Sequence, residues 1–444
     1  MLKTFPKGGV HPPENKLTAD KKIEILPIPK QVTIPIAQHI GAPAKIIVNK
    51  KDKVKTGQLI AESGGFVSAN IHSSVSGTVL KIDNIADASG YKRPAVVIQV
   101  EGDEWLENID RTDTLKKDFD FNKNEILKKI QDAGIVGLGG ATFPTHVKLL
   151  PPKGMKAEIL IINGVECEPY LTADHRLMLE KGEEIFVGIK ILMKALGVNK
   201  AVIGIENNKA DVIAFMTELS KKYDNISVTA LQVKYPQGGE KQLIKAVIGR
   251  EVPSGELPIK VGAVVHNVGT VFAVYEAVQK NKPLLERVVT VTGKSLSNPK
   301  NLSVRIGTPV SMLIEAAGGL PDDTGKIISG GPMMGKALNS AEATVTKGTS
   351  GILILPKEES KRREIKPCIR CAKCVGVCPM GLEPFLLMTL SQKALFERTE
   401  KEDVSDCIEC GSCSYICPSD RPLLDYIRLG KSAVGKMRRA RSVK

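Results

Sequence analysis

Cysteines supply the most specific chemical pattern in this sequence. Eight of its nine cysteines fall in two runs, and each run reads C-x2-C-x2-C-x3-C followed by proline. Three thiolates at x2 spacing can close around one iron–sulfur cube from a single loop, while the fourth, next to proline, reaches the neighbouring cluster. The pattern predicts two [4Fe-4S] clusters with exchanged fourth ligands. One is held by Cys368, Cys371, Cys374 and Cys417, and the other by Cys407, Cys410, Cys413 and Cys378.

Zinc and disulfides are the alternatives for these cysteines. Zinc sites use paired C-x2-C units rather than triplets, and disulfides do not persist in a reducing compartment. The ninth cysteine, Cys167, stands apart from both runs and is interpreted as a small apolar filler. Iron–sulfur clusters are therefore the favoured interpretation.

A glycine-rich loop is the second candidate site. The segment Gly137–Lys148 reads GLGGATFPTHVK. Glycine lets backbone amides approach a phosphate or a flavin closely, Lys148 can neutralise phosphate, and Phe143 offers a ring for stacking. The loop follows a helical stretch rather than a strand, so it departs from the Rossmann fingerprint. Taken alone, the pattern favours an ordinary tight turn over a ligand site.

Length and composition indicate a multidomain globular chain. The sequence has 444 residues, enough for about three domains, with 42% apolar and 25% charged residues. The longest charge-free stretch, Val261–Tyr275, is shorter than the roughly 18 residues that a membrane-spanning helix needs. No apolar segment follows the lysines near the N-terminus, so no secretory signal is expected and the expected compartment is cytoplasmic.

The chain is basic, with a formal net charge of +14. This surplus favours an anionic partner, although most charges are interspersed in sign. The stretch Lys431–Lys444 differs, because it carries six basic residues and no acidic one. We expect a basic tail there, either solvated or in contact with anionic lipid at a membrane surface.

Strand and helix patterns divide the chain into segments. From Val32 to about Val100, short alternating strands with the half-motifs V-x-x-G-x-x-I and S-G-T-V resemble the barrel-sandwich hybrid of biotinyl and lipoyl carriers. The stretch Ser63–Ala69 between the halves has no lysine to carry such a cofactor, so this unit is interpreted as structural. From about Asn122 to Gln279, β-branched runs alternate with amphipathic segments, which predicts an α/β layer with a mostly parallel sheet.

Four strands and four helices are expected in that layer. The strands are Glu158–Ile162, Ala201–Ile205, Ser227–Val233 and Gly262–Val265, and the helices are Leu177–Leu196, Ala210–Tyr223, Glu240–Ile248 and Val271–Gln279. Arg287–Lys336 reads as a β-grasp unit around a helix at Pro309–Ala317, and Pro356–Pro367 as a charged linker to a mostly helical cluster module.

The predicted fold class is multidomain α/β. Its expected parts are an N-terminal arm at 1–30, a barrel-sandwich hybrid at 31–105, an α/β domain at 120–284, a β-grasp domain at 285–355, a ferredoxin-like domain with two [4Fe-4S] clusters at 356–430, and the basic tail at 431–444.

Three further segments follow predicted strands, where α/β sheets gather ligands. They are NGVECEPY, KYPQGGEKQL and HNVGT, which begin at Asn163, Lys234 and His266. Together with the glycine loop, their order resembles the flavin and nicotinamide site of the 51 kDa subunit of respiratory complex I. Nearly the whole chain, from GGVHPPENK to the paired cysteine runs, resembles the C subunits of Rnf complexes. Those membrane-bound ferredoxin:NAD oxidoreductases couple electron transfer to sodium or proton translocation.

The resemblance implies that the α/β domain at 120–284 is an FMN/NADH-binding domain, which holds FMN non-covalently and exchanges hydride with NAD(H). The residues that would line FMN are Gly137, Gly139, Gly140, Lys148, Asn163, Glu166, Tyr235, Gly238, Gly239, Glu240, Asn267 and Thr270. Phe143 and Glu168 would face the nicotinamide nucleotide, while Thr142 departs from the glycine usual before FPT. The implied partners are the membrane and ferredoxin-accepting subunits of the complex. The implied place is peripheral, on the cytoplasmic face of the cell membrane.

Two other functions compete with this one. A soluble FMN and iron–sulfur cobalamin reductase of the microcompartment type shares the flavin core and clusters, but that family lacks the leading GGVHPPENK and the barrel-sandwich region. A nucleic-acid-binding iron–sulfur protein would explain the positive charge. Aromatic content of 4% and the lack of a basic stripe with interleaved aromatics argue against it, so no nucleic acid is expected as a partner.

Overall fold

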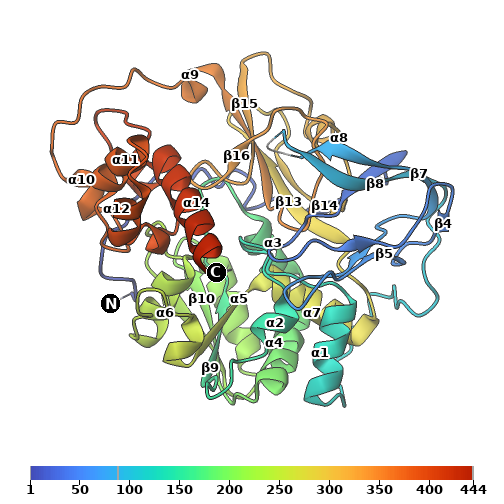
Figure 1. Ribbon diagram of the computed structural model, residues 1–444. Helices are drawn as coiled ribbons and strands as arrows, with labels where there is room; N and C mark the ends of the chain where they lie inside the picture. Colours follow the sequence, from blue (N-terminus) through green and yellow to red (C-terminus); the bar gives the residue numbers. More distant parts are fainter. Residues whose placement is uncertain (1, 88–89, 443–444) are drawn as a thin grey trace.

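A parallel four-stranded sheet forms the centre of the molecule. The structure is a computed structural model that describes residues 2–87 and 90–442. A β-sandwich, a six-stranded sheet and a helical module lie around the central sheet (Figure 1). The central strands follow the order β11-β10-β9-β12 and are all parallel. They are β9 (Ile159–Asn163), β10 (Ala201–Glu206), β11 (Ile226–Leu231) and β12 (Ala263–Asn267).

Both faces of this sheet are buried, which explains its nearly continuous apolar strands. Successive side chains of a strand point to opposite faces. Leu160 and Ile162 of β9 pack into the large core, while Ile159 and Ile161 pack into a second core under a single helix. That helix is α6 (Glu240–Ile248), and the helices of the larger core include α4 (Gly182–Leu196), α5 (Ala210–Ser220) and α7 (Val268–Lys280).

The elements expected in this layer lie where the sequence placed them, with one difference. The single helix predicted over Leu177–Leu196 is two helices, α3 (Ala173–Glu180) and α4, which are separated at Lys181. Gly182 permits this break, because the absence of a side chain lets the start of α4 pack against the ring of Phe215. A Cβ atom on Gly182 would lie 2.6 Å from that ring.

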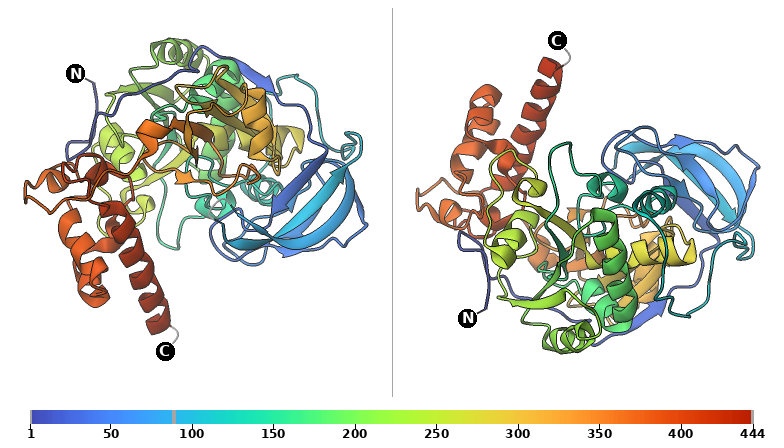
Figure 2. Two further views of the ribbon diagram at one scale, coloured as in Figure 1. Left: turned by 90° about the horizontal axis from the view of Figure 1, so that it is seen from above. Right: turned by 90° about the horizontal axis from the view of Figure 1, so that it is seen from below.

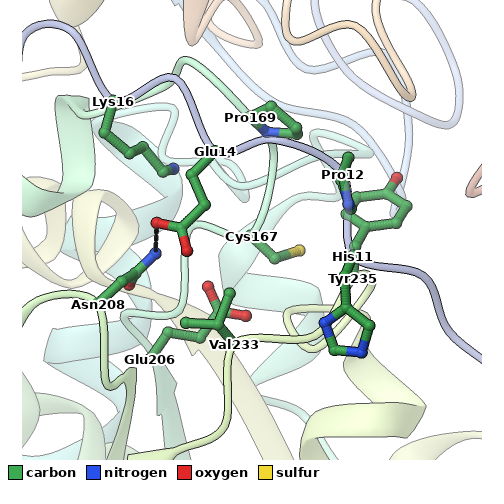
Figure 3. A pocket seen from close by; sticks show the side chains of 10 residues that line it. All are labelled: His11, Pro12, Glu14, Lys16, Cys167, Pro169, Glu206, Asn208, Val233 and Tyr235. Carbon is green, nitrogen blue, oxygen red and sulfur yellow. Dashed lines mark hydrogen bonds between the residues drawn. The ribbon is translucent and has the colours of Figure 1, made fainter.

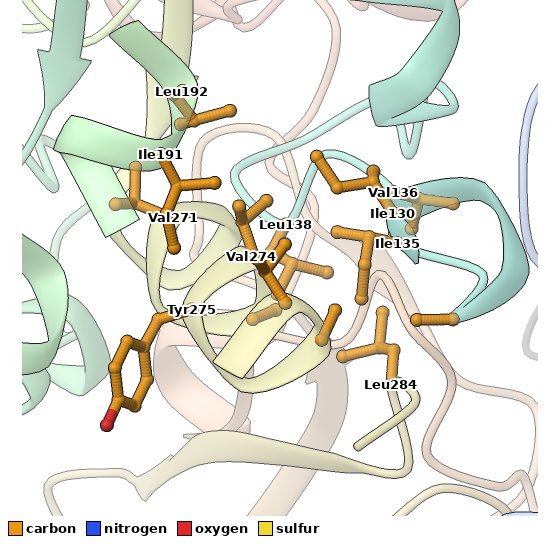
Figure 4. Close-up of a cluster of buried hydrophobic side chains, with 14 of the residues drawn as sticks. Ile130, Ile135, Val136, Leu138, Ile191, Leu192, Val271, Val274, Tyr275 and Leu284 are labelled. Carbon is orange, nitrogen blue, oxygen red and sulfur yellow. The ribbon is translucent and has the colours of Figure 1, made fainter. Parts of the chain in front are cut away.

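The start of the glycine loop is anchored in the large core. Ile135, Val136 and Leu138 pack among side chains of α7, α4 and α1 (Lys123–Asp132), as Figure 4 shows. The loop leads into the short helix α2 (Thr145–Lys148). Its tip is therefore held at both ends while Gly139 and Gly140 stay exposed.

The β-sandwich contains two antiparallel sheets. One has the order β2-β8-β7-β4 and the other β3-β5-β6. In β2, buried Val32 and Ile34 alternate with less buried neighbours, as a half-buried strand requires. The strands are β2 (Gln31–Pro35), β3 (Lys45–Ile46), β4 (Lys53–Val54), β5 (Leu59–Glu62), β6 (Ile71–His72), β7 (Gly77–Ala86) and β8 (Lys92–Val100).

The N-terminal arm contributes a strand to the six-stranded sheet. β1 (Ile23–Ile25) pairs in parallel with β14, so this part of the predicted arm forms an edge of the sheet β1-β14-β13-β17-β15-β16. The helix α8 (Val310–Ala316) belongs to the same unit. The other strands are β13 (Glu286–Thr292), β14 (Lys300–Arg305), β15 (Thr324–Ser329), β16 (Lys336–Ala337) and β17 (Gly351–Pro356).

The cysteine module is helical. Its core contains Leu387, Met388, Val404 and Ile427. Part of the predicted linker is ordered as helix α9, and an exposed loop follows from residue 361. The helices are α9 (Lys357–Ser360), α10 (Lys373–Gly376), α11 (Pro384–Gln392), α12 (Phe396–Lys401), α13 (Ser412–Tyr415) and α14 (Leu423–Ser442).

The structure differs from the expected basic tail, whose last two positions, 443–444, lie outside the described residues. Residues 431–442 continue α14, so the predicted boundary at residue 430 falls inside a helix that projects from the body of the molecule (Figure 2). Val434 is buried in the module, and the Lys431 ammonium donates to the carbonyl of Cys407 at 2.6 Å. Arg438 and Arg441 both pair with Glu400. Charge alone suggested a tail, whereas these contacts make the stretch part of the module.

A buried lysine joins three parts of the molecule. Lys347, which precedes β17, donates through Nζ to the carbonyls of Asn70 in the β-sandwich and Gly134 after α1, both at 2.7 Å. Its side chain is 1% exposed, and burial lowers its pKa to about 7. Two carbonyls accept from the nitrogen, and a neutral amine has two N–H groups, so the uncharged side chain can still donate to both.

Replacing Lys347 with Met should lower the thermal unfolding midpoint. Methionine keeps an unbranched stem but leaves two buried carbonyls without a donor, at about 1–3 kcal/mol for each. Lys336→Met, at an exposed position in the same unit, is the matched control. If calorimetry finds the same small shift of the unfolding midpoint for both variants, the buried nitrogen does not hold the three parts together.

Candidate functional site

The glycine loop meets the end of β12. Gly137 N–H donates to the carbonyl of Phe143 at 2.9 Å, which closes the loop, and Leu138 N–H donates to Thr270 Oγ1 at 2.8 Å. Gly139 lies against the side chain of Asn267, where an added Cβ would come within 2.9 Å. A glycine is required there by this close approach. Gly140 has open space in front of its Cα, so the tip of the loop can face a ligand.

Thr142 has a left-handed backbone, with φ +53°. This conformation is rare for a β-branched residue and costs about 1–3 kcal/mol. Its hydroxyl donates to the carbonyl of Ala141 at 2.7 Å, and its methyl group lies near Gly348. The departure from glycine at this position is therefore accommodated with a strained backbone.

Four predicted flavin residues take part in two groups of hydrogen bonds, one of Asn163 with Gly238 and one of Glu166 and Asn267 with the start of α3. Asn163 Nδ2 donates to the carbonyl of Gly238 at 2.9 Å, and Glu166 accepts the amides of Asp174 and His175 at the start of α3. Asn267 Nδ2 donates to Asp174 Oδ2 at 2.6 Å. Burial, together with the nearby Glu166 carboxylate, raises the pKa of Asp174 to about 7. Together these hydrogen bonds tie the loop after β9 to the loops after β11 and β12.

An ion pair lies at the start of α6. Lys148 Nζ and Glu240 Oε1 are 2.5 Å apart, and both side chains are partly exposed. Gly239, the N-cap of α6, offers no side chain to the free amides of the helix, and an added Cβ there would lie 2.6 Å from Gln242 Oε1. A cation beside unpaired helix amides suits an anionic group such as a phosphate.

Buried polar atoms without a partner lie around these segments. Within the described ranges they include Nδ1 of His146 in α2, Nε2 of His266 in β12, Nε2 of Gln237 and Oε1 of Gln242. Such atoms are costly unless something bonds them. The glycine cradle, the cation and these unpaired groups fit a polar cofactor at this edge of the sheet.

Two lysines, the half-buried Lys16 and the buried Lys209, hold the loop after β9. Lys16, from the N-terminal arm, donates to the carbonyls of Glu166, Glu168 and Leu171 at 2.8, 2.9 and 2.7 Å. Lys209 donates to the carbonyl of Val165 at 2.8 Å. Burial lowers the pKa of Lys16 to about 8.

A cavity of about 240 Å³ lies between this loop and the arm. His11, Glu14 and Lys16 line it from the arm, and Cys167 and Glu206 line it from the sheet (Figure 3). Burial raises the pKa of Glu206 to about 7 and raises that of the Cys167 thiol. Cys167 accepts the amide of Gly238 through Sγ at 3.4 Å.

Glu168 and Tyr235 contact other units of the molecule. Glu168 accepts the amides of Met333 and Met334, at 3.2 and 2.7 Å, from the six-stranded unit, and burial raises its pKa to about 7. Tyr235 Oη donates to the carbonyl of Cys410 at 2.7 Å. The placement of Glu168 and Phe143 beside a nicotinamide nucleotide stays a prediction. Phe143 is half-buried in the loop.

One set of four cysteines shares a small, mostly apolar cavity. Cys378 of the first run lines it together with Cys407, Cys410 and Cys413 of the second. Within the described ranges, no three His, Cys, Asp or Glu side chains lie close enough to hold one metal ion. A four-iron cube is larger than one ion and is ligated from around its body, which suits a cavity with four thiols on its walls.

The other four cysteines lie nearer the surface. Cys368 and Cys371 are exposed, and Cys374 and Cys417 are partly buried. Burial raises the pKa of Cys374, and the nearby Cys417 adds to the shift. We call the four thiols that share the cavity the inner set and the other four the outer set; assignment of the outer set to one cluster stays a prediction.

Known protein families match the chain in the same order as these units. Residues 3–103 match the RnfC barrel sandwich hybrid domain, 130–276 the Nuo51 FMN-binding domain, 288–337 the SLBB domain and 360–418 a 4Fe-4S dicluster domain. The C subunit of the proton-translocating ferredoxin:NAD(+) oxidoreductase complex of Clostridium ljungdahlii is 50% identical over 97% of this chain and 94% of its own length. The chain belongs to this family of C subunits. The matches confirm the predicted fold class.

A second member of the family shows the same extent of similarity. The C subunit of the Na(+)-translocating ferredoxin:NAD(+) oxidoreductase complex of Acetobacterium woodii is 46% identical over 98% of each chain. An NAD+-reducing [NiFe]-hydrogenase in the air-oxidized state has a similar fold, with TM-score 0.51 and 18% identity, over 70% of this chain and 66% of its own. Among the described residues, no helix is both long and apolar enough to cross a bilayer.

Several residues that shape the site in this family member carry no distinctive sequence signal. Lys16 and Lys209 lie outside any ligand pattern, and Asp174 belongs to an ordinary helix start. Arg287, in β13, is buried and donates to the carbonyls of Leu138 and Thr349 at 3.3 and 3.2 Å. In the sequence, Arg287 is a charged residue at the start of a β-branched run. Such a position is too common to indicate a functional residue.

Replacing Lys16 with Met should loosen the loop after β9. Three buried carbonyls would lose their donor, at about 1–3 kcal/mol each, so we expect a clearly lower unfolding midpoint and faster proteolysis of the arm. Lys22→Met, at an exposed position of the same arm, is the control. If both variants unfold and are cleaved like the original protein, Lys16 does not hold the loop.

Proposed function

We propose that this chain is the peripheral electron-transfer subunit of an ion-translocating ferredoxin:NAD(+) oxidoreductase complex. It would exchange hydride between NAD(H) and FMN and pass single electrons through two [4Fe-4S] clusters, coupled in the complex to Na+ or H+ translocation. The observation that carries the proposal is the presence of an FMN-binding domain and a dicluster domain in one chain, together with 50% identity to the C subunit of such a complex.

The flavin would bind non-covalently at the carboxyl edge of the central sheet. FMN supplies the chemistry that converts a two-electron hydride into single electrons. The exposed Gly139 and Gly140 amides and the start of α6 would face its phosphate or ring, and Lys148 would neutralise phosphate charge. Asn163, Glu166, Asn267 and Thr270 would hold the surrounding loops in place through the hydrogen bonds described above.

The inner and outer cysteine sets would hold one cluster each. Cys378, Cys407, Cys410 and Cys413 would hold the inner one, and Cys368, Cys371, Cys374 and Cys417 the outer one. The inner set lies next to the flavin segments, because Tyr235 donates a hydrogen bond to the carbonyl of Cys410 and belongs to the same hydrophobic cluster as that residue. The exposure of Cys368 and Cys371 supports an outer cluster that faces a partner.

The other subunits of the complex would hold the chain at the cytoplasmic face of the cell membrane. Lipid contact through the basic stretch 431–444 gains little support, because Lys431, Arg438 and Arg441 already pair with Glu409 and Glu400. The cobalamin reductase alternative gains no support, because the N-terminal barrel sandwich matches the RnfC family.

Protein purified without oxygen should contain about eight irons and one FMN per chain, the irons following from two four-iron clusters.

Cys378→Ser should damage the same cluster as Cys410→Ser, and Cys417→Ser the same one as Cys371→Ser. Electron paramagnetic resonance of the four variants makes the comparison. If the spectrum of Cys378→Ser instead matches that of Cys371→Ser, each run binds its own cluster.

NADH should reduce the bound flavin of the isolated chain. Lys148→Glu should lose FMN and this reaction, because it replaces the cation with a second carboxylate beside Glu240, while iron content stays unchanged. Lys153→Glu, at an exposed position, is the control. A flavin spectrum that dithionite bleaches and NADH leaves unchanged would refute the nicotinamide assignment.

A further inference from the structure

Tyr235 and Gln242 each link the predicted flavin segments to the cysteine module. Tyr235, in the loop after β11, donates through Oη to the carbonyl of Cys410 at 2.7 Å. Gln242, in the first turn of α6, donates through Nε2 to Met380 Sδ at 3.3 Å. Both donors belong to the segment KYPQGGEKQL, whose glycines are predicted to line FMN.

The two links differ in strength and in where they end. The link from Tyr235 ends on a predicted cluster ligand itself, because Cys410 is one of the four inner thiols. Its hydroxyl-to-carbonyl distance is typical of a well-formed O–H···O hydrogen bond. The link from Gln242 ends on a thioether, which is a weak acceptor, in the residue that lies two positions beyond Cys378. Tyr235 therefore makes the stronger and more direct link.

Both the main chain and the side chain of Tyr235 are held in place. The residue is 3% exposed and belongs to a hydrophobic cluster with Val10 and Cys410. Its main chain exchanges two hydrogen bonds with Val10 of the arm, at 2.8 and 2.9 Å. The arm also reaches the cysteine module, where Gly9 N–H donates to the carbonyl of Val377 at 2.9 Å. The ring is thus fixed in position beside Cys410.

We infer that Tyr235 couples the flavin site to the inner cluster, with its ring and its hydrogen bond to Cys410 as the path for single electrons. The inference rests on the proposed function, which requires electrons to pass between FMN and the clusters. Electrons tunnel faster through bonds and hydrogen bonds than across an equal gap without them. Each transfer moves one electron from the reduced flavin to the oxidised inner cluster, makes and breaks no covalent bond, and leaves the tyrosine unchanged.

The same hydrogen bond has a second measurable effect. Hydrogen bonds around an iron–sulfur cluster help to set its reduction potential. Reduction adds negative charge to the cluster, and the hydroxyl of Tyr235 places a positively polarised hydrogen next to the Cys410 backbone. Loss of this hydroxyl should therefore lower the reduction potential of the inner cluster.

The test uses the full chain, loaded with FMN and iron, and compares four variants with the original protein. Tyr235→Phe removes only the hydroxyl, and Tyr235→Leu also removes the ring. Gln242→Leu removes the other link. Tyr415→Phe is the control, because it removes a tyrosine hydroxyl from an exposed position of the cysteine module.

Stopped-flow absorbance after mixing with NADH gives the rates of flavin and cluster reduction in the same trace. The ratio of the two rates is compared, so that a change in nucleotide binding does not affect the result. We expect the ratio to fall in Tyr235→Phe, and the fast phase of cluster reduction to be lost in Tyr235→Leu. Gln242→Leu and Tyr415→Phe should keep the original ratio.

Reduction with dithionite, followed by electron paramagnetic resonance, gives the midpoint potential of each cluster without NADH. Tyr235→Phe should lower the potential of one cluster only, the one that Cys410→Ser damages. Tyr415→Phe should leave both potentials unchanged. A shift of the other cluster in Tyr235→Phe would contradict the assigned contact.

The outcomes separate failure of the inference from failure of the proposed function. If both Tyr235 variants keep the original ratio of rates, or if Gln242→Leu lowers it more than they do, the inference is overturned while the proposed function stands. If NADH leaves the clusters of the original protein oxidised, the proposed function is refuted and the inference with it.

Discussion

The path of the chain after β9 depends on the ammonium groups of Lys16 and Lys209. Between Asn163 and Leu171 the backbone turns its carbonyls inward, and Glu166 and Tyr170 adopt positive φ angles of 47° and 70°. Such a path leaves several buried carbonyls without sheet or helix partners, which is costly. Lys16 has three N–H groups and meets three of these carbonyls. A neutral side chain of similar length could not supply three donors from one atom.

This loop separates two environments. On one side, Asn163 and Glu166 connect to Gly238, Asp174 and Asn267 at the flavin segments. On the other side, Glu168 and the neighbouring Tyr235 reach the six-stranded unit and the cysteine module. The loop after β9, together with Tyr235 from the loop after β11, therefore sets the position of the candidate flavin site relative to the inner cysteines. A shift of these loops would disturb both sites together.

Local patterns predicted much of this architecture, and long-range contacts explain the rest. The strands and helices of the central layer follow from apolar periodicity. The spacing of the cysteines also led to the grouping of Cys378 with Cys407, Cys410 and Cys413, which share one cavity, while the outer set stays a prediction. The pairing of β1 with β14 could not be predicted, because IEI in the arm is too short to indicate a strand. The helical state of residues 431–442 was hidden by their charge, since Glu400 and Glu409, which pair with this stretch, lie far away in sequence. Lys16 and Arg287 likewise act on carbonyls that no sequence pattern identifies.

Burial of the inner thiols links the fold of the cysteine module to its cofactor. Burial raises the pKa of Cys407 to about 11 and that of Cys413 to about 12, so burial favours the protonated thiols near neutral pH. Ligation of iron requires the thiolate, and the positive charge of iron removes the penalty that burial imposes. These same residues pack against Leu387, Leu423 and Ile427 in the core of the module. The inner cysteines therefore serve as core residues and ligands at once, and we expect cluster assembly and packing of this module to be coupled, whereas the exposed Cys368 and Cys371 contribute little to that core.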